Sequence, residues 1–146
     1  MKAADFEAPD HIAVRMKDMS ATHEFVDAIG KLRGIQQQLV AISDRTDSDR
    51  KLDLVNLRRE LSIQIGIVSN VAEKTFLVTA TEEDVRQFRT LLSTMRRAVA
   101  LHQANFPAVK LDEQSIAYDM SVKSVRNANA KFTQWIDAVL EKRWSN

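Results

Sequence analysis

The sequence predicts an all-α protein, an antiparallel up-down four-helix bundle with a short N-terminal helix or arm. Two observations lead to this prediction. Apolar residues recur at steps of three and four along four successive segments, which is the spacing of a buried helix face. The chain of 146 residues also has only three glycines and two prolines, so few turns are available and the helices have to be long. We expect residues 1–19 to form the arm and residues 20–146 the bundle domain.

The first part of the chain predicts a short helix followed by a long one. Pro9 and Asp10 can start a short helix that continues to Met16. From Ser20 or Thr22 onward an amphipathic face develops, with the apolar members Phe25, Ile29, Leu32, Ile35, Leu39 and Ile42. The polar run 43–50 that follows indicates a solvated loop, and it offers several residues that can cap a helix.

A second helix is expected to begin near Asp49. Its apolar stripe consists of Leu54, Leu57, Leu61, Ile65, Val68, Ala72 and Phe76, and the spacing describes two eleven-residue repeats, which are typical of a nearly straight helix. A β-hairpin between Leu61 and Thr81 is the alternative, because residues 61–67 alternate in polarity and residues 76–81 are rich in β-formers. The helix is favoured because the eleven-residue pattern continues on both sides of the alternating patch.

The third helix has a recognisable start, buried face and end. Thr81 and Asp84 form a capping pair at its start, and Pro107 follows its end. The seam of this helix contains Val85, Phe88, Leu92, Met95, Val99, His102 and Phe106. Leu91 and Ala98 widen the seam, which indicates a multi-helix core rather than a two-stranded coil.

A fourth helix is expected to be capped by Asp112 or Ser115. Its broad apolar face is formed by Ile116, Met120, Val125, Phe132, Trp135, Ile136, Val139 and Leu140. Four amphipathic helices with short connections bury their faces most readily by packing antiparallel to one another.

All three glycines lie inside predicted helices, where each costs about 1 kcal/mol relative to alanine. Gly30 and Gly34 share one helix face, and Gly66 is flanked by Ser62 and Ser69. These small residues make all three glycines candidates for a close helix contact. The contact could be inside the bundle or, alternatively, at a homodimer crossing or a hinge.

The charges are nearly balanced overall, with 21 basic and 20 acidic residues, but the last two helices carry basic clusters. The candidate partner-binding cations are Arg86, Arg89, Arg96, Arg97, Lys123 and Arg126. If the two helices form a hairpin about Pro107, Arg97 is expected level with Lys123, and Arg89 level with Arg126 and Lys131. Such a belt could bind nucleic acid or an acidic partner. Phe88 and Phe132 occupy core positions and cannot stack on bases, so a solvated face is the other interpretation.

Three further residues interrupt the pattern. His102 is a polar member of an apolar seam, which favours a hydrogen-bonded core histidine that sets register; a phosphotransfer histidine is the alternative. Trp135 and Trp144 near the C-terminus are candidate partner-binding anchors, because tryptophan is enriched at interfaces. Each could instead cap the core of its own bundle.

These features predict a non-enzymatic protein-interaction module, such as an adaptor, regulator or assembly subunit, that can form a homodimer. The alternatives are binding of nucleic acid or an acidic partner through the basic belt and, third, a phosphotransfer module. We find no motif for catalysis, a metal or a cofactor. With no cysteine, no apolar run of membrane-spanning length and acidic residues where a signal peptide would be apolar, we expect a cytoplasmic protein without membrane insertion.

Overall fold

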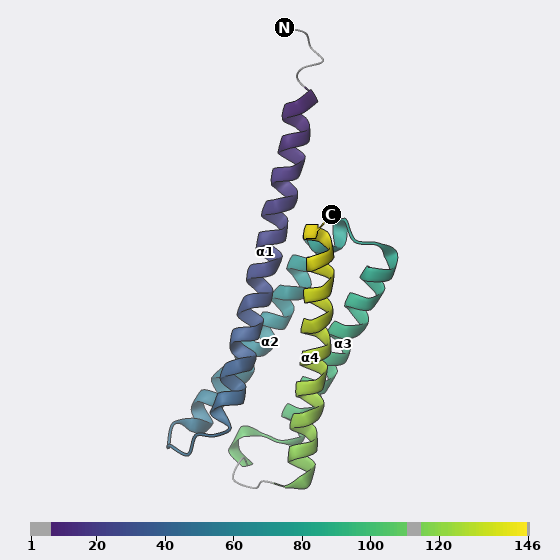
Figure 1. Cartoon of the computed structure of the whole chain (residues 1–146). Coiled ribbons are helices and arrows are strands. Elements are labelled where there is room, and N and C mark those ends of the chain that lie inside the picture. Colours follow the sequence, from purple (N-terminus) through teal and green to yellow (C-terminus); the bar gives the residue numbers. More distant parts are fainter. Residues whose placement is uncertain (1–6, 111–114, 146) are drawn as a thin grey trace.

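The computed structural model describes the backbone of residues 7–110 and 115–145, and the side chains of residues 22–110 and 115–143. Its four helices are α1 (Glu7–Ile42), α2 (Arg50–Lys74), α3 (Glu82–Asn105) and α4 (Ile116–Ser145), as shown in Figure 1. Two short 3-10 helices, η2 (Phe76–Val78) and η3 (Ala108–Lys110), lie in the connections after α2 and α3. The all-α prediction is therefore confirmed. No described residue is in a strand, so the β-hairpin alternative for residues 61–81 is wrong.

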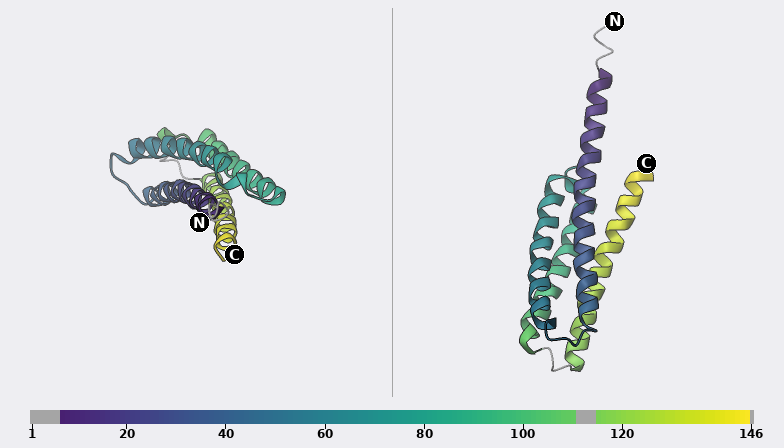
Figure 2. Two further views of the ribbon diagram at one scale, coloured as in Figure 1. Left: turned by 90° about the horizontal axis from the view of Figure 1, so that it is seen from above. Right: turned by 90° about the vertical axis from the view of Figure 1, so that its left-hand side faces the viewer.

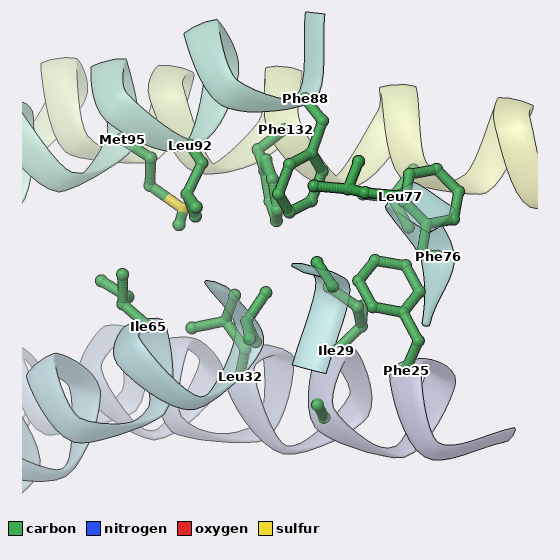
Figure 3. Close-up of a cluster of buried hydrophobic side chains, with 14 of the residues drawn as sticks. Phe25, Ile29, Leu32, Ile65, Phe76, Leu77, Phe88, Leu92, Met95 and Phe132 are labelled. Carbon is green, nitrogen blue, oxygen red and sulfur yellow. The ribbon is translucent and has the colours of Figure 1, made fainter. Parts of the chain in front are cut away.

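The helices form two antiparallel hairpins, α1 with α2 and α3 with α4, which pack against each other as a bundle (Figure 2). Figure 3 shows the contact between these two layers: Phe25, Ile29, Leu32 and Ile65 point from α1 and α2 toward the α3 and α4 layer. The predicted bundle is thus confirmed. None of the helices, over the residues that the structure describes, is long and apolar enough to cross a membrane.

The first helix differs from its prediction, because α1 is one continuous helix from Glu7 rather than a short helix followed by a second start near Ser20 or Thr22. The residues between His11 and Ser20 include neither glycine nor proline, so nothing interrupts the helical backbone there. Pro9 lies in the first turn, where a helix has no hydrogen bond for its missing N–H to break. The first turns of α1 extend beyond the ends of the other helices (Figure 1).

The centre of the core is an aromatic cluster that joins all the layers. Phe25 of α1 stacks on Phe76 of η2 with ring centroids 4.7 Å apart. Phe88 of α3 contacts both rings, at 6.2 and 5.8 Å, and it also contacts Phe132 of α4 at 5.7 Å. The predicted seam of α3 continues this core, because Phe88, Leu92, Met95 and Val99 are all buried.

The α1–α2 connection is held by charged side chains rather than by the predicted cap. Asp49 precedes α2 but makes no capping hydrogen bond with its side chain. Arg45 instead binds Asp47 at 2.6 Å and Asp53 at 2.7 Å, which ties the loop to the first turn of α2 and lowers the pKa of Asp47 to about 2. Arg50 donates to the carbonyl oxygens of Ile42 and Ser43 at 3.2 and 3.3 Å, which satisfies groups at the end of α1.

The caps of the last two helices follow the sequence. Thr81 Oγ1 accepts a hydrogen bond of 3.1 Å from the backbone N–H of Asp84, and Ser115 Oγ accepts one of 3.1 Å from the N–H of Tyr118. Both hydroxyls therefore satisfy N–H groups that a helix start leaves without a partner. The other proposed cap, Asp112, lies outside the described residues.

We expect Thr81→Ala to lower the free energy of unfolding by about 1 kcal/mol, because it removes this cap of α3. Urea denaturation followed by circular dichroism measures the change. Thr79→Ala is the matched control, since Thr79 is exposed and lies outside α3. Equal effects of the two substitutions would argue against the cap.

Candidate functional site

The basic residues at the start of α3 are neutralised by neighbours. Arg86 binds Glu83 of the same helix, with an Nη2–Oε1 distance of 2.6 Å. Arg89 binds Glu73 of α2 at 3.0 Å. These ion pairs remove two members from the predicted cationic belt. The remaining four, Arg96, Arg97, Lys123 and Arg126, are exposed, and no ion pair joins any of them to another described residue.

The contacts between α3 and α4 fit both the predicted register and one shifted by less than a helical turn. The ring contacts of Phe88 with Phe132 and of His102 with Tyr118, with centroids 5.7 and 5.5 Å apart, fit the predicted level of Arg97 with Lys123. The contact of Phe88 with Trp135 and the distance of 2.8 Å between His102 Nδ1 and Ser121 Oγ fit a level of Arg97 with Arg126. Both cations of α4 therefore lie within reach of the level of Arg97.

Trp135 belongs to the edge of the bundle's own core. Its ring contacts those of Phe76 and Phe88 with centroid distances of 6.2 and 6.3 Å, and its Nε1–H donates to Oε1 of Gln87. These contacts account for a tryptophan at this position without a partner protein. The side chain of Trp144, the second proposed anchor, lies outside the described residues.

The three glycines do not mediate close contacts between helices inside the described part of the bundle, whereas the homodimer crossing and the hinge stay predictions. A Cβ atom built on Gly30, Gly34 or Gly66 meets no atom within 4 Å apart from its chain neighbours and the backbone of its own helix. Gly34 instead lines a surface groove between α1 and α2, together with Ile35 and Ile63. Sequence spacing shows that two small residues share a helix face, but it does not show whether that face points inward or outward.

The outward face of α2 carries an apolar stripe that the sequence analysis did not identify. We define the outer stripe as Leu52, Val55, Ile63 and Ile67, which are 62%, 48%, 54% and 42% exposed. Grooves lie on both sides of it, one toward α1 and one lined by Arg59, Ser62 and Ala108. The sequence does contain the outer stripe, because its four residues fall between the members of the buried stripe. The helix α2 is therefore apolar on two faces.

A cavity of about 100 Å³ lies at the end of the bundle that holds the α1–α2 connection. Residues of all four helices line it. The apolar part of its wall is formed by Leu39, Val40, Ile42, Leu54, Leu61, Val99, Val122 and Val125. The polar part is formed by Gln36, Ser43, Arg50, Arg58, His102, Gln103, Tyr118, Arg126 and Asn129.

Two partly buried side chains in this wall have shifted pKa values. Burial lowers the pKa of the Arg58 guanidinium. Burial also lowers the pKa of His102, and the positive charge of Arg58 adds to this shift. The His102 ring lies between Phe106 and Tyr118, at centroid distances of 5.6 and 5.5 Å. This environment disfavours a phosphotransfer histidine, which needs an accessible ring and is activated by a neighbouring base.

No protein-family model matches the chain, and neither a curated protein nor a solved structure is significantly similar to it. Within the described residues, no group of three or more metal-ligating side chains is close enough to hold a metal ion. The functional inferences below therefore depend on the outer stripe and on the cavity.

Proposed function

We propose that this protein is a non-enzymatic interaction module that forms a homodimer through the outward face of α2. The observation that carries the proposal is the outer stripe, four large apolar side chains along one exposed helix face. Soluble monomers seldom expose a large contiguous apolar surface unless it is an interaction site. Grooves on both sides of the stripe provide room for the side chains of a second helix.

The sequence of this face is complementary to itself in size. In an antiparallel pair of α2 helices related by a two-fold axis between Ile63 and Gly66, each Ile63 is level with Gly66 of the second copy. Each Ile67 is then level with Ser62, and each Arg59 with Asn70. Large residues thus meet small ones, so the two helices can approach closely. A two-fold axis produces the same contact twice, as a closed dimer requires.

The glycine at this crossing has an unoccupied space beside it in the single chain, since a Cβ on Gly66 meets no atom within 4 Å among the described residues. A second copy explains why a helix retains a glycine that costs about 1 kcal/mol. Arg59, which lies between Val55 and Ile63 of the stripe, does not oppose the pairing, because it faces the neutral Asn70 in this arrangement.

We expect the protein to sediment as a concentration-dependent dimer, and Ile63→Arg to raise the dimer Kd by about 30-fold or more, the effect of removing an interface hot spot. Analytical ultracentrifugation measures this Kd. The matched control is Leu101→Arg, which places the same charge at a 56% exposed leucine of α3 and is expected to leave the Kd unchanged.

Gly66→Leu distinguishes a lost contact from a damaged fold. The added side chain has space within its own chain and raises helix propensity, so the monomer is expected to keep or increase its thermal stability. It blocks the approach of Ile63 from the second copy, so the dimer is expected to dissociate. A wild-type protein that stays monomeric at every concentration, or a dimer that tolerates both substitutions, would contradict the proposal.

Binding of nucleic acid or an acidic protein is the second candidate function. It is favoured by four exposed cations of the predicted belt, Arg96, Arg97, Lys123 and Arg126, which make no ion pair with another described residue. Affinity for a phosphate backbone falls steeply with salt concentration, whereas an apolar dimer contact persists. The salt dependence of any complex therefore separates the two functions.

A further inference from the structure

We propose that the cavity between the four helices is a binding site for a small carboxylate with a branched apolar body. No residue of the outer stripe lines this cavity, although Arg58 and Gln103 also line one of the grooves beside the stripe. The ligand can therefore be tested separately from the dimer. Three properties of the cavity carry the proposal: its charge, its uncommitted polar groups, and its size and apolar walls.

The positive charge of the side chains that line the cavity favours a negatively charged ligand. Arg50, Arg58 and Arg126 line it, and none of the described lining residues is acidic. Arg50 is already committed to the carbonyl oxygens at the end of α1. Arg58 is partly buried, and in the described chain its guanidinium makes one hydrogen bond, of 2.8 Å to the carbonyl oxygen of Phe106, and no ion pair. A positive charge held away from water without a counter-charge is unfavourable, and a bound anion removes that cost.

The polar groups that remain can orient a carboxylate. The guanidinium of Arg58 has N–H groups to spare, and arginine binds carboxylates through two parallel hydrogen bonds. Asn129 Oδ1 is buried and has no hydrogen-bond partner among the described residues; rotation of this amide brings its NH₂ group into the same position. Buried polar groups are normally paired, so an amide side chain that is left unpaired in a cavity wall indicates a ligand.

The size and the apolar walls of the cavity determine the size and polarity of the part of the ligand beyond its carboxylate. Leucine, isoleucine and valine contribute eight of the 17 residues that line the cavity, and these apolar side chains disfavour a strongly hydrated dianion such as phosphate. The volume of about 100 Å³ is smaller than the ~150 Å³ apolar cavity that accommodates benzene. The apolar body of the ligand is therefore smaller than benzene, as the four-carbon branched body of isovalerate is, and its carboxylate lies at the polar part of the wall.

The test is titration of the protein with isovalerate, followed by isothermal calorimetry and by NMR of the side chains that line the cavity. We expect saturable binding with a Kd of about 1 mM or tighter. The neutral isostere isovaleramide, and acetate, which lacks the branched body, are each expected to bind at least about tenfold more weakly. Absence of saturable isovalerate binding, or equal affinity for acid and amide, overturns the proposal.

Variants locate the site. Arg58→Gln is expected to weaken isovalerate binding at least about tenfold, whereas Arg59→Gln, which removes the same charge from the exposed neighbour on α2, leaves it unchanged. Val125→Phe fills the cavity, so it is expected to abolish binding while the folded state keeps its thermal stability. Equal effects of Arg58→Gln and Arg59→Gln, or full affinity in the filled variant, would place the ligand elsewhere.

The pH dependence is a further readout of the same site. Burial and the positive charge of Arg58 lower the pKa of His102, and a bound anion raises that pKa again. The other charged or titratable side chains that line the cavity with His102 are Arg50 and Arg58 on α2 and Tyr118 and Arg126 on α4. Isovalerate is therefore expected to bind more tightly at pH 6 than at pH 8, and His102→Gln removes this difference.

Discussion

Phe88→Ala is expected to lower the free energy of unfolding by about 3–5 kcal/mol, the range observed when a buried phenylalanine is truncated. Phe88 is 1% exposed, and its ring contacts aromatic rings from α1, η2 and α4. Removal of the ring therefore leaves a cavity where both helical hairpins meet. Urea denaturation monitored by circular dichroism measures the loss.

The control for this substitution is Leu101→Ala on the same helix. Leu101 is 56% exposed, so its truncation is expected to change stability by no more than about 0.5 kcal/mol. Both variants place alanine in α3, and the comparison separates burial from helix propensity. A loss of less than about 1 kcal/mol in Phe88→Ala would show that the two hairpins do not share one aromatic core.

Gln64→Glu is expected to lower the free energy of unfolding by about 3 kcal/mol at pH 8, although it changes only one amide to a carboxylate. Gln64 is 6% exposed, and its Nε2 donates a hydrogen bond of 2.9 Å to the carbonyl oxygen of Ala28 on α1. A carboxylate cannot donate, so it would face this oxygen as a second acceptor in a buried position. Lys31 and Glu60 line the groove next to it, and their opposite charges largely offset one another.

This penalty depends on pH. Burial raises the pKa of the new carboxyl group above its value of about 4.3 in the unfolded chain. The destabilisation is therefore complete above the folded-state pKa, and it disappears as the pH falls toward the unfolded value, where the protonated group can donate to Ala28 again. Denaturation of Gln64→Glu at pH 5 and pH 8 checks the difference. Gln37→Glu on the exposed side of α1 is expected to show none, and a similar pH response there would contradict the explanation.

The two faces of α2 give this helix a central position in the molecule. Its inner face contributes Leu61, Ile65 and Val68 to the core, and Gln64 joins it to α1. Its outer face carries the stripe through which we propose that two copies associate, and its first half supplies Arg58 to the cavity. Substitutions on the inner face are thus expected to change folding stability, whereas those on the outer face change association.

The sequence was sufficient to predict the helices and most of their buried faces. The start of α3 after Thr81 was predicted to the residue, and its end before Pro107 to within one residue, because capping and proline effects act over a few neighbouring positions. The buried seam from Phe88 to Val99 was predicted because helical periodicity records which side of a helix is apolar. The continuous start of α1 was missed, because a weak apolar pattern between residues 11 and 20 was taken as a boundary although no residue there breaks a helix.

Only the tertiary structure decided how these helices meet, and with that the candidate sites. Packing of α3 against α4 placed His102 beside Ser121 and between the rings of Phe106 and Tyr118. The pairing of Arg89 with Glu73, the open space beside the glycines and the gathering of Arg58, His102 and Asn129 around one cavity likewise depend on residues far apart in the chain. Periodicity and caps are local properties that a sequence displays directly, whereas these contacts are fixed only when whole helices pack against one another.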